Sequence, residues 1–444
     1  MDDAPVGAPV TVDRPTPDVR PARPGRRALH VLGAILLLTL TLRTAVTGLS
    51  PLLPRVSEGV PLTAAEAGVV GALPPFCFAL AGLLGPPLLR RSAAERVVLL
   101  LAGLQIVGLL LRPWSPGPWP FVAASVVALL GMGLGNVVLP VLVKAWFPHR
   151  IPTVTSMYVM GVTAGTSLPA LFAVPVADAV TRSTGDTRLG WQVGLSWWAS
   201  LSLLVIIAWL GPAGRPRATP PPLVSTSGLE APESTPGHRR TGPGGPWLSR
   251  TAWGIMLLFG ANSLTSYAMF AWLPTRLVEA GMAPATAGVM LAVFGGMGVP
   301  AALVVPHLAA RFGRIALLAT QFAACFAIGE LGLLLAPLHL TLLWVVIAGW
   351  GSGGFSLALT LIGLRSRTPA GAARLSGFAQ GLGYLMAGFG PIIAGVLRQE
   401  TGGWTVPFAV LIGILVLMVV GGVLANRRLT VEDELEARAA NLVG

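Results

Sequence analysis

Charged residues are scarce in this sequence. Asp, Glu, Lys and Arg make up 11% of its 444 residues, whereas hydrophobic residues reach 54%. A typical soluble domain carries about 25% charged residues, so this composition excludes a soluble globular chain. The mean hydropathy of +0.74 agrees with that conclusion. The apolar residues are grouped in blocks long enough to cross a bilayer, and lipid is therefore the first predicted partner.

Cysteine and histidine are also rare, with two Cys and five His. Cys77 and Cys325 lie in separate apolar blocks without a neighbouring Cys or His, which excludes a disulfide framework and a metal-ligand spacing. The apolar blocks contain no Ser–His or Cys–His pair, no H-E-x-x-H motif and no G-x-x-x-x-G-K-[ST] motif. An intramembrane enzyme or an ATP-driven pump would need such groups. The sequence therefore predicts no enzyme, no metal and no cofactor.

Twelve apolar blocks of spanning length form two groups of six. The first group runs approximately over 31–53, 65–88, 96–112, 119–143, 153–177 and 190–211. The second runs approximately over 251–275, 285–308, 315–337, 340–364, 373–397 and 404–425. We predict an all-α integral membrane protein with 12 transmembrane helices in two pseudo-symmetric six-helix halves. Its predicted parts are a disordered cytoplasmic tail (1–27), an N-terminal half (28–211), a cytoplasmic linker (212–250), a C-terminal half (251–425) and a cytoplasmic tail with a short surface helix (426–444).

Basic residues are distributed unevenly between the two faces of this arrangement. If both termini are cytoplasmic, the outer face holds six of the 30 Lys and Arg residues, Arg43 lies within a span, and the others are cytoplasmic. The six are Arg55, Arg112, Arg182, Arg188, Arg276 and Arg398. This bias is the positive-inside pattern of a multi-pass protein of the inner (plasma) membrane. Topology thus explains the net charge of +12, and no nucleic-acid partner is predicted.

The two halves carry matching residues at a shift of 220 positions. Ala67-Gly68-Val69 matches Ala287-Gly288-Val289, and Pro54 matches Pro274. Further matches at this shift are Arg91 with Arg311, Ser156 with Ser376 and Gly161 with Gly381. Two parallel six-span repeats are typical of transporters that bind their substrate between the repeats, near the midplane of the membrane.

One arginine interrupts the first span, LLLTLTLRTAVTGLSPLLP (36–54). Counted from Val31, Arg43 lies roughly 18 Å along a helix that rises about 1.5 Å per residue, near the middle of a hydrocarbon core about 30 Å thick. A guanidinium group facing lipid at that depth is costly. We therefore expect Arg43 to face a polar cavity, with a structural tie to backbone carbonyls as the alternative. Its planar set of donors suits a compact anionic or strongly dipolar substrate.

Three stretches carry a more specific pattern: LRTAVTGLSPLLP in span one, GMGLGNVVLPVLVKAWFPHR across span four, and LSGFAQGLGYLMAGFGP in span eleven. Together with Trp404, these stretches resemble the cyanate/2-nitroimidazole transporter family of the major facilitator superfamily. The resemblance covers Leu42 to Trp404 without the linker. It implies the superfamily's twelve-helix fold and transport of a small compact solute, such as cyanate or a nitroimidazole, across the inner membrane. The superfamily's loop signature, roughly D-R-x-G-R, is incomplete, because the second copy begins with Ala310 in place of the acid.

Spans one, four, seven and ten are expected to line the cavity in this architecture. The predicted substrate-binding residues on these spans and on span eleven are Arg43, Thr47, Asn136, Asn262, Trp350, Gln380 and Tyr384. Arg43 and Thr47 are four residues apart and share a helix face, as do Gln380 and Tyr384. Phe76 is expected to shape the pocket together with Trp350. For each Asn or Gln, a hydrogen bond between helices is the alternative role.

Energy coupling and the direction of transport stay open at this stage. Glu330 is the acid that lies well inside a span, and span nine is expected at the periphery, so a structural bond to a neighbouring helix is its favoured role. Protons are retained as a coupling partner, with uniport as the alternative. A superfamily exporter of drugs or metabolites and a non-transporting, sensor-like relative are the alternative functions. We expect a monomer.

Overall fold

The computed structural model describes residues 26–148, 150–210, 245–427 and 429–443. Residues 1–25 of the predicted tail and most of the predicted linker lie outside the described residues, so the disorder of both segments stays a prediction. The first helix begins at Arg26, slightly before the predicted start of the N-terminal half. The charged C-terminal tail forms the predicted short helix, α18 (Val431–Val443).

Twelve helical segments of the described chain are long and apolar enough to cross a membrane, which confirms the predicted number of spans. The N-terminal half contains α1 (Arg26–Thr41), α2 (Thr44–Thr47), η1 (Ser50–Leu52), α3 (Leu53–Gly59), α4 (Ala64–Arg91), α5 (Ala94–Leu111), η2 (Arg112–Trp114), α6 (Pro118–Trp146), α7 (Ile151–Thr184), α8 (Thr187–Ser196) and α9 (Ala199–Leu210). The C-terminal half contains η4 (Pro246–Leu248), α10 (Arg250–Glu279), α11 (Pro284–Gly296), α12 (Gly298–Phe312), α13 (Ile315–Leu335), α14 (Thr341–Gly351), α15 (Gly353–Leu364), α16 (Pro369–Thr401) and α17 (Thr405–Leu424).

The first span is a series of short helices rather than one continuous helix. Helix α1 ends at Thr41, and Arg43 precedes α2 with φ −130° and ψ 1°. The hydroxyls of Thr39 and Thr41 donate to carbonyl oxygens three residues earlier, at 2.6 and 2.8 Å. Such side-chain bonds compete with the helical ladder and bend helices. A 3-10 turn over Ser50–Leu52, with Pro51 as its second residue, follows, so the chain around Arg43 is interrupted on both sides.

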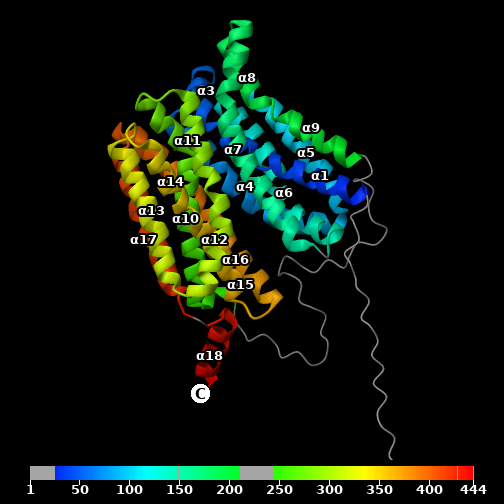
Figure 1. The fold of residues 1–444 in the computed structure, drawn as a ribbon, viewed down its shortest axis with the longest axis vertical. Coiled ribbons are helices and arrows are strands. Elements are labelled where there is room, and N and C mark those ends of the chain that lie inside the picture. The colour runs from blue at the N-terminus through cyan, green and yellow to red at the C-terminus, as the bar shows by residue number, and fades with distance from the viewer. Residues whose placement is uncertain (1–25, 149, 211–244, 428, 444) are drawn as a thin grey trace, which may run out of the picture.

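The two halves contact each other mainly through α4 against α16 and α7 against α11. Figure 1 shows the two bundles meeting near the top of the view and splaying apart toward α18. Hydrogen bonds join the halves where they meet: the hydroxyl of Ser50 donates to the carbonyl of Ala271 at 2.8 Å, and that of Ser167 donates to the carbonyl of Ala292 at 2.9 Å. We call this region the closed end, formed by residues 50–76, 166–170, 271–296 and 388–399.

Glycines allow the backbones of the two halves to approach closely at the closed end. A Cβ atom on Gly68 of α4 would lie 2.7 Å from the carbonyl oxygen of Pro391 in α16. A Cβ on Gly395 of α16 would lie 2.5 Å from the carbonyl oxygen of Ala64. Small residues of this kind let membrane helices pack backbone to backbone. The closed end is therefore sealed by direct helix contact.

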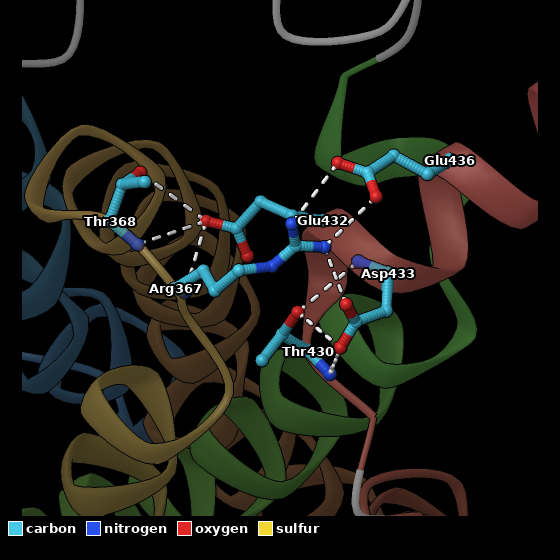
Figure 2. A network of polar contacts seen from close by, with 6 residues as sticks. All are labelled: Arg367, Thr368, Thr430, Glu432, Asp433 and Glu436. Atoms are coloured by element: carbon cyan, nitrogen blue, oxygen red, sulfur yellow. Dashed lines mark hydrogen bonds and ion pairs between the residues drawn. The ribbon is translucent and has the colours of Figure 1, made fainter.

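Helix α18 holds together several parts of the C-terminal half. Arg367, between α15 and α16, forms ion pairs with Asp433 and Glu436 of α18 (Figure 2). On the other side of α18, Glu434 accepts a hydrogen bond of 2.6 Å from the hydroxyl of Thr251, at the start of α10. The helix thus connects the beginning of α10 to the loop before α16.

Candidate functional site

Arg43 lies at the break in the first span, half-buried between helices. Its guanidinium carbon is 4.5 Å from the centre of the Phe78 ring in α4. Its Nη1 atom is shielded from solvent and has no hydrogen-bond acceptor among the residues that the structure describes. No acidic side chain in the described ranges forms an ion pair with it. The group therefore retains a donor and a positive charge for another molecule, and its position in a substrate cavity stays a prediction.

Two tyrosines of the C-terminal half lie near this cation. Tyr267 of α10 and Tyr384 of α16 lie close enough to Arg43 for its charge to act on their hydroxyls. Tyr384 packs edge-on against Phe259, with ring centres 5.0 Å apart. Tyr267 packs against Phe270, with ring centres 6.2 Å apart. A cationic group from one half thus faces aromatic groups from the other.

Two of the predicted site residues form bonds that hold helices together. The Thr47 hydroxyl donates to the carbonyl of Thr166 in α7 at 2.7 Å, which ties α2 to α7. Asn262 is fully buried in α10, and its amide donates to the carbonyl of Gly351 at 3.1 Å. Its Oδ1 atom has no partner in the described part of the chain. Both residues support the helices around the site, and substrate contact by either stays a prediction.

The other predicted residues lie in different surroundings. Gln380 is half-buried in α16, and its amide donates to the hydroxyl of Ser376 at 2.6 Å. Trp350 packs on Phe322 within the C-terminal half, with ring centres 6.1 Å apart. Asn136 is half-buried in α6. The structure thus brings Arg43 and Tyr384 together, while substrate contact by these three residues stays a prediction.

Phe76, which was expected to shape the pocket, lies at the contact between the halves. Its ring packs edge-on against Phe389 of α16, with centres 6.1 Å apart. A Cβ atom on Gly388 would lie 2.3 Å from the same ring. Phe76 therefore fills the space between α4 and α16, next to the site.

The sequence analysis missed two residues near the site. Arg112 was assigned to the outer face, but the structure buries it with 2% exposure, and its Nη1 donates to the carbonyl of Ala45 at 3.0 Å. Tyr267 was not selected, although it is one of only three tyrosines in the chain. It also occupies the position that matches Thr47 at the 220-residue shift. The sequence match between Tyr267 and the predicted site residue Thr47 could have identified Tyr267 as a site candidate.

The expected bond from Glu330 to a neighbouring helix is not formed. Glu330 is fully buried in α13, and neither carboxyl oxygen has a partner among the described residues. An ionised carboxylate in such surroundings is strongly disfavoured. The geometry therefore fits a carboxyl group that carries its proton.

Comparison with known proteins agrees with this architecture. Residues 35–388 match the model of the Major Facilitator Superfamily. The chain is 32% identical over 408 residues to the 2-nitroimidazole transporter of Escherichia coli (strain K12), covering 91% of this chain and 97% of that protein. It is 27% identical over 380 residues to the cyanate transport protein CynX of the same organism, covering 85% of this chain and 92% of that protein.

A solved structure shares the fold at low sequence identity. The crystal structure of a bacterial homolog to the human lysosomal transporter Spinster, in an inward-facing and occupied conformation, aligns with a TM-score of 0.68 and 16% identity. The alignment covers 94% of this chain and 98% of that one. The fold, the matching residues and the relatives lead to one conclusion: the chain belongs to the major facilitator superfamily, in the family of the 2-nitroimidazole and cyanate transporters, and is a secondary transporter of small solutes.

Proposed function

We propose that this transporter moves a small monovalent anion, or a solute of similar size with a strong dipole, and that Arg43 is its anchor. The observation that carries the proposal is the buried Nη1 of Arg43, which has no acceptor in the described part of the chain. A buried cationic donor without a partner is costly, and a bound anion would offset that cost. Cyanate and 2-nitroimidazole, the solutes named for the two relatives, are the first candidates.

The aromatic residues of the C-terminal half would complete the binding site. A planar or linear solute beside Arg43 would contact the face or edge of Tyr384 and Tyr267, and their hydroxyls could donate to it. Aromatic contacts of this kind contribute about 0.5–1.5 kcal/mol each. Asn136, Gln380 and Trp350 are proposed as further contacts, made once the halves have rocked relative to each other.

We propose that the chain lies in the inner membrane with both termini in the cytoplasm, as the distribution of its basic residues favours. The closed end is then the outer end, and the site opens toward the cytoplasm. A monomer is proposed as the working unit, because the cationic and aromatic sides of the site both come from one chain.

Transport into proteoliposomes tests the anchor. Labelled cyanate and a labelled 2-nitroimidazole would be supplied to wild type, Arg43→Gln and Arg43→Lys. Arg43→Gln should lose uptake, and Arg43→Lys should retain a part of it, because lysine keeps the charge but not the planar set of donors. The matched control is Arg55→Gln, which removes an arginine that pairs with Asp178 at 2.7 Å and is 30% exposed. Normal uptake by Arg43→Gln would overturn the proposal.

The role of protons is tested at Glu330. We expect Glu330→Gln to fold and to transport at the wild-type rate, because a neutral amide replaces a neutral acid of the same shape. Accumulation against a gradient would be measured with and without a pH gradient. If the variant loses only the response to the pH gradient, Glu330 couples transport to protons, and the expectation of a structural role is wrong.

A further inference from the structure

A second buried arginine lies on the other side of the break in the first span. Arg112, at the end of the third span, has its guanidinium carbon 4.9 Å from the centre of the Phe121 ring. Its Nη1 donates to the carbonyl of Ala45, two residues beyond Arg43, at 3.0 Å. Its Nε is buried, and no acceptor within the described ranges reaches it. No acidic side chain described by the structure pairs with Arg112, so a second positive charge is left without a counter-ion.

Arg112 lines a small, partly open cavity of about 30 Å³. Tyr267 and Ala271 of α10 and Ser125 of α6 also line this cavity. The Ser125 hydroxyl donates a hydrogen bond of 2.7 Å to the carbonyl of Phe121. Its oxygen atom is therefore still able to accept a hydrogen bond. Tyr267 forms no hydrogen bond with any residue that the structure describes. The cavity therefore combines a cation, a phenol and a hydroxyl.

The size of the cavity restricts what can enter it. One water needs roughly 10–15 Å³ of such space, so the cavity holds about two or three groups of that size. A linear anion of three heavy atoms matches this space. A substituted five-membered ring does not fit unless the surrounding helices move.

The cavity also lies on the path from Arg43 toward the closed end. Tyr267 lines it and is close enough to Arg43 to feel its charge. Beyond it, Ala271 accepts the hydrogen bond from Ser50 that joins the two halves. A Cβ atom on Gly71 would lie 2.8 Å from the Ala271 side chain. Tyr267 thus lies near Arg43 and also lines the cavity of Arg112, and this cavity extends to the seal between the halves.

We propose that Arg112 and its cavity are a second binding position for compact monovalent anions, reached from Arg43 past Tyr267. An anion of about three heavy atoms binds first at Arg43 and then moves to Arg112 before the closed end opens. A bulkier aromatic solute stays at Arg43 alone. This inference rests on the proposed function, because it assigns a substrate class to the same transport path.

The competing role for Arg112 is purely structural, in which it only fixes Ala45. The two roles differ in their dependence on solute size. A structural defect would weaken binding of cyanate and of a 2-nitroimidazole equally. Loss of a size-restricted position would weaken cyanate binding and spare the ring compound.

The test measures binding of both solutes to the purified full-length protein in detergent, by calorimetry and by the ligand-dependent rise in melting temperature. The variants are Arg112→Gln, Arg112→Lys and Arg43→Gln. The matched control is Arg276→Gln, because Arg276 also donates to a backbone carbonyl, that of Leu334 at 3.0 Å, but lies outside the cavity. Arg112→Gln should weaken cyanate binding about tenfold, as for loss of one charge-assisted bond, and change 2-nitroimidazole binding less than about twofold. Arg112→Lys should fall between wild type and Arg112→Gln.

A second variant keeps the test decisive if Arg112→Gln fails to fold. Ser125→Val leaves Arg112 in place, removes the hydroxyl and narrows the cavity, and it should also weaken cyanate binding selectively. Equal weakening of both solutes, or no weakening by either variant, overturns the second position. If Arg43→Gln still binds both solutes as wild type does, the proposed function itself fails. If Arg43→Gln loses binding while both cavity variants bind normally, the second position at Arg112 is rejected and the proposed function is retained.

Discussion

The two halves share a helical arrangement but contribute different chemistry to the site. In the N-terminal half the first span is broken at Arg43, and the buried Arg112 donates to the carbonyl of Ala45, two residues farther along. In the C-terminal half the corresponding helix, α10, is continuous from Arg250 to Glu279. At the 220-residue shift Ser263 replaces Arg43, and Tyr267 replaces Thr47. The N-terminal half therefore supplies the positive charges and the rings that pack on them, Phe78 and Phe121, whereas the C-terminal half supplies tyrosines.

This difference has a physical reason. Arg43 and Arg112 already repel each other in a medium of low dielectric constant, where Coulomb energies are several-fold larger than in water, and a further cation on the C-terminal half would add to that repulsion. An aromatic ring beside a cation is attracted to it instead, by about 0.5–2 kcal/mol. A duplicated fold can thus keep its arrangement of six helices per half while the buried positive charges stay in one half. The comparison teaches that pseudo-symmetry of the helices does not imply symmetry of the site.

The largest expected effect comes from matched substitutions at the two corresponding positions. Arg43→Gln should lower substrate affinity by about 2–3 kcal/mol, because a charged donor to a buried anion is lost. Ser263→Ala should leave affinity within about twofold, since the Ser263 hydroxyl is buried without a partner among the described residues. Binding of cyanate by calorimetry measures both. Equal losses in the two variants would show that the halves contribute alike.

A smaller effect is expected where the halves meet. Gly68→Ala would place a Cβ 2.7 Å from the Pro391 carbonyl, so the closed end should be destabilised by about 1–3 kcal/mol. A cysteine introduced at Ala64, in a background without Cys77 and Cys325, would then react faster with an impermeant maleimide.

Gly82→Ala on the same helix is the control, because a Cβ there meets nothing within 4 Å. An unchanged labelling rate in Gly68→Ala would contradict the assignment of backbone contact as the seal.

Replacement of Tyr384 of the C-terminal half should have a still smaller effect on binding. Tyr384→Leu should weaken binding of either solute by about 1 kcal/mol through loss of an aromatic contact with the solute. Tyr384→Phe keeps the ring and its packing on Phe259, and it should bind within about threefold of wild type unless the hydroxyl contacts the solute. Equilibrium binding of both variants separates the two contributions. A Leu variant with wild-type affinity would remove Tyr384 from the site.

The smallest expected effect is on the stability of α18, which connects parts of the C-terminal half. Hydrogen bonds from Thr430, together with Arg367, lower the pKa of the Asp433 carboxyl below its usual value of 3.8. A depressed pKa stabilises the docked helix above the ordinary pKa, and the contribution is lost as pH falls through the folded value. The protection of α18 amides from hydrogen exchange, after correction for the intrinsic pH dependence of exchange, should therefore be constant near neutral pH and fall only below about pH 4.

Asp433→Asn should raise the exchange rate of α18 at neutral pH by a small factor, because exposed ion pairs contribute little. Glu400→Gln removes an exposed carboxylate elsewhere and should leave α18 unchanged. Transport by Asp433→Asn at the wild-type rate is expected, since α18 lies in contact with helix ends and not with the site.

The twelve spans were predictable because spanning length and composition are local properties of the chain. The position of Arg43 between helices was also predictable, since a cation in the middle of an apolar block is costly in lipid, and its role in binding stays a prediction. The break beside it was not predictable, because it depends on hydroxyl-to-backbone bonds that compete weakly with a helix. Whether Asn262 bonds to Gly351 or to a solute depends on how α10 packs against the turn after α14, which span lengths do not determine.

Arg112 shows most clearly where sequence reasoning fails. It follows the apolar helix α5 and precedes a turn that contains Pro and Gly, so its position indicates a surface arginine. Its burial results from contacts far along the chain, with Ala45 and Phe121. The count of basic residues on the outer face therefore included a side chain that never reaches that surface. The predicted orientation is unaffected, because removing Arg112 from that face increases the bias.

The two unpaired arginines also have an electrical consequence. One bound monovalent anion neutralises one of the two positive charges, so the loaded carrier keeps one and the empty carrier keeps two. Moving a full unit charge through a membrane potential of 100 mV involves about 2.3 kcal/mol, and a partial displacement involves a fraction of that. The potential would therefore bias the empty carrier more strongly than the loaded one. Initial uptake rates under an imposed potassium diffusion potential would measure this voltage dependence directly.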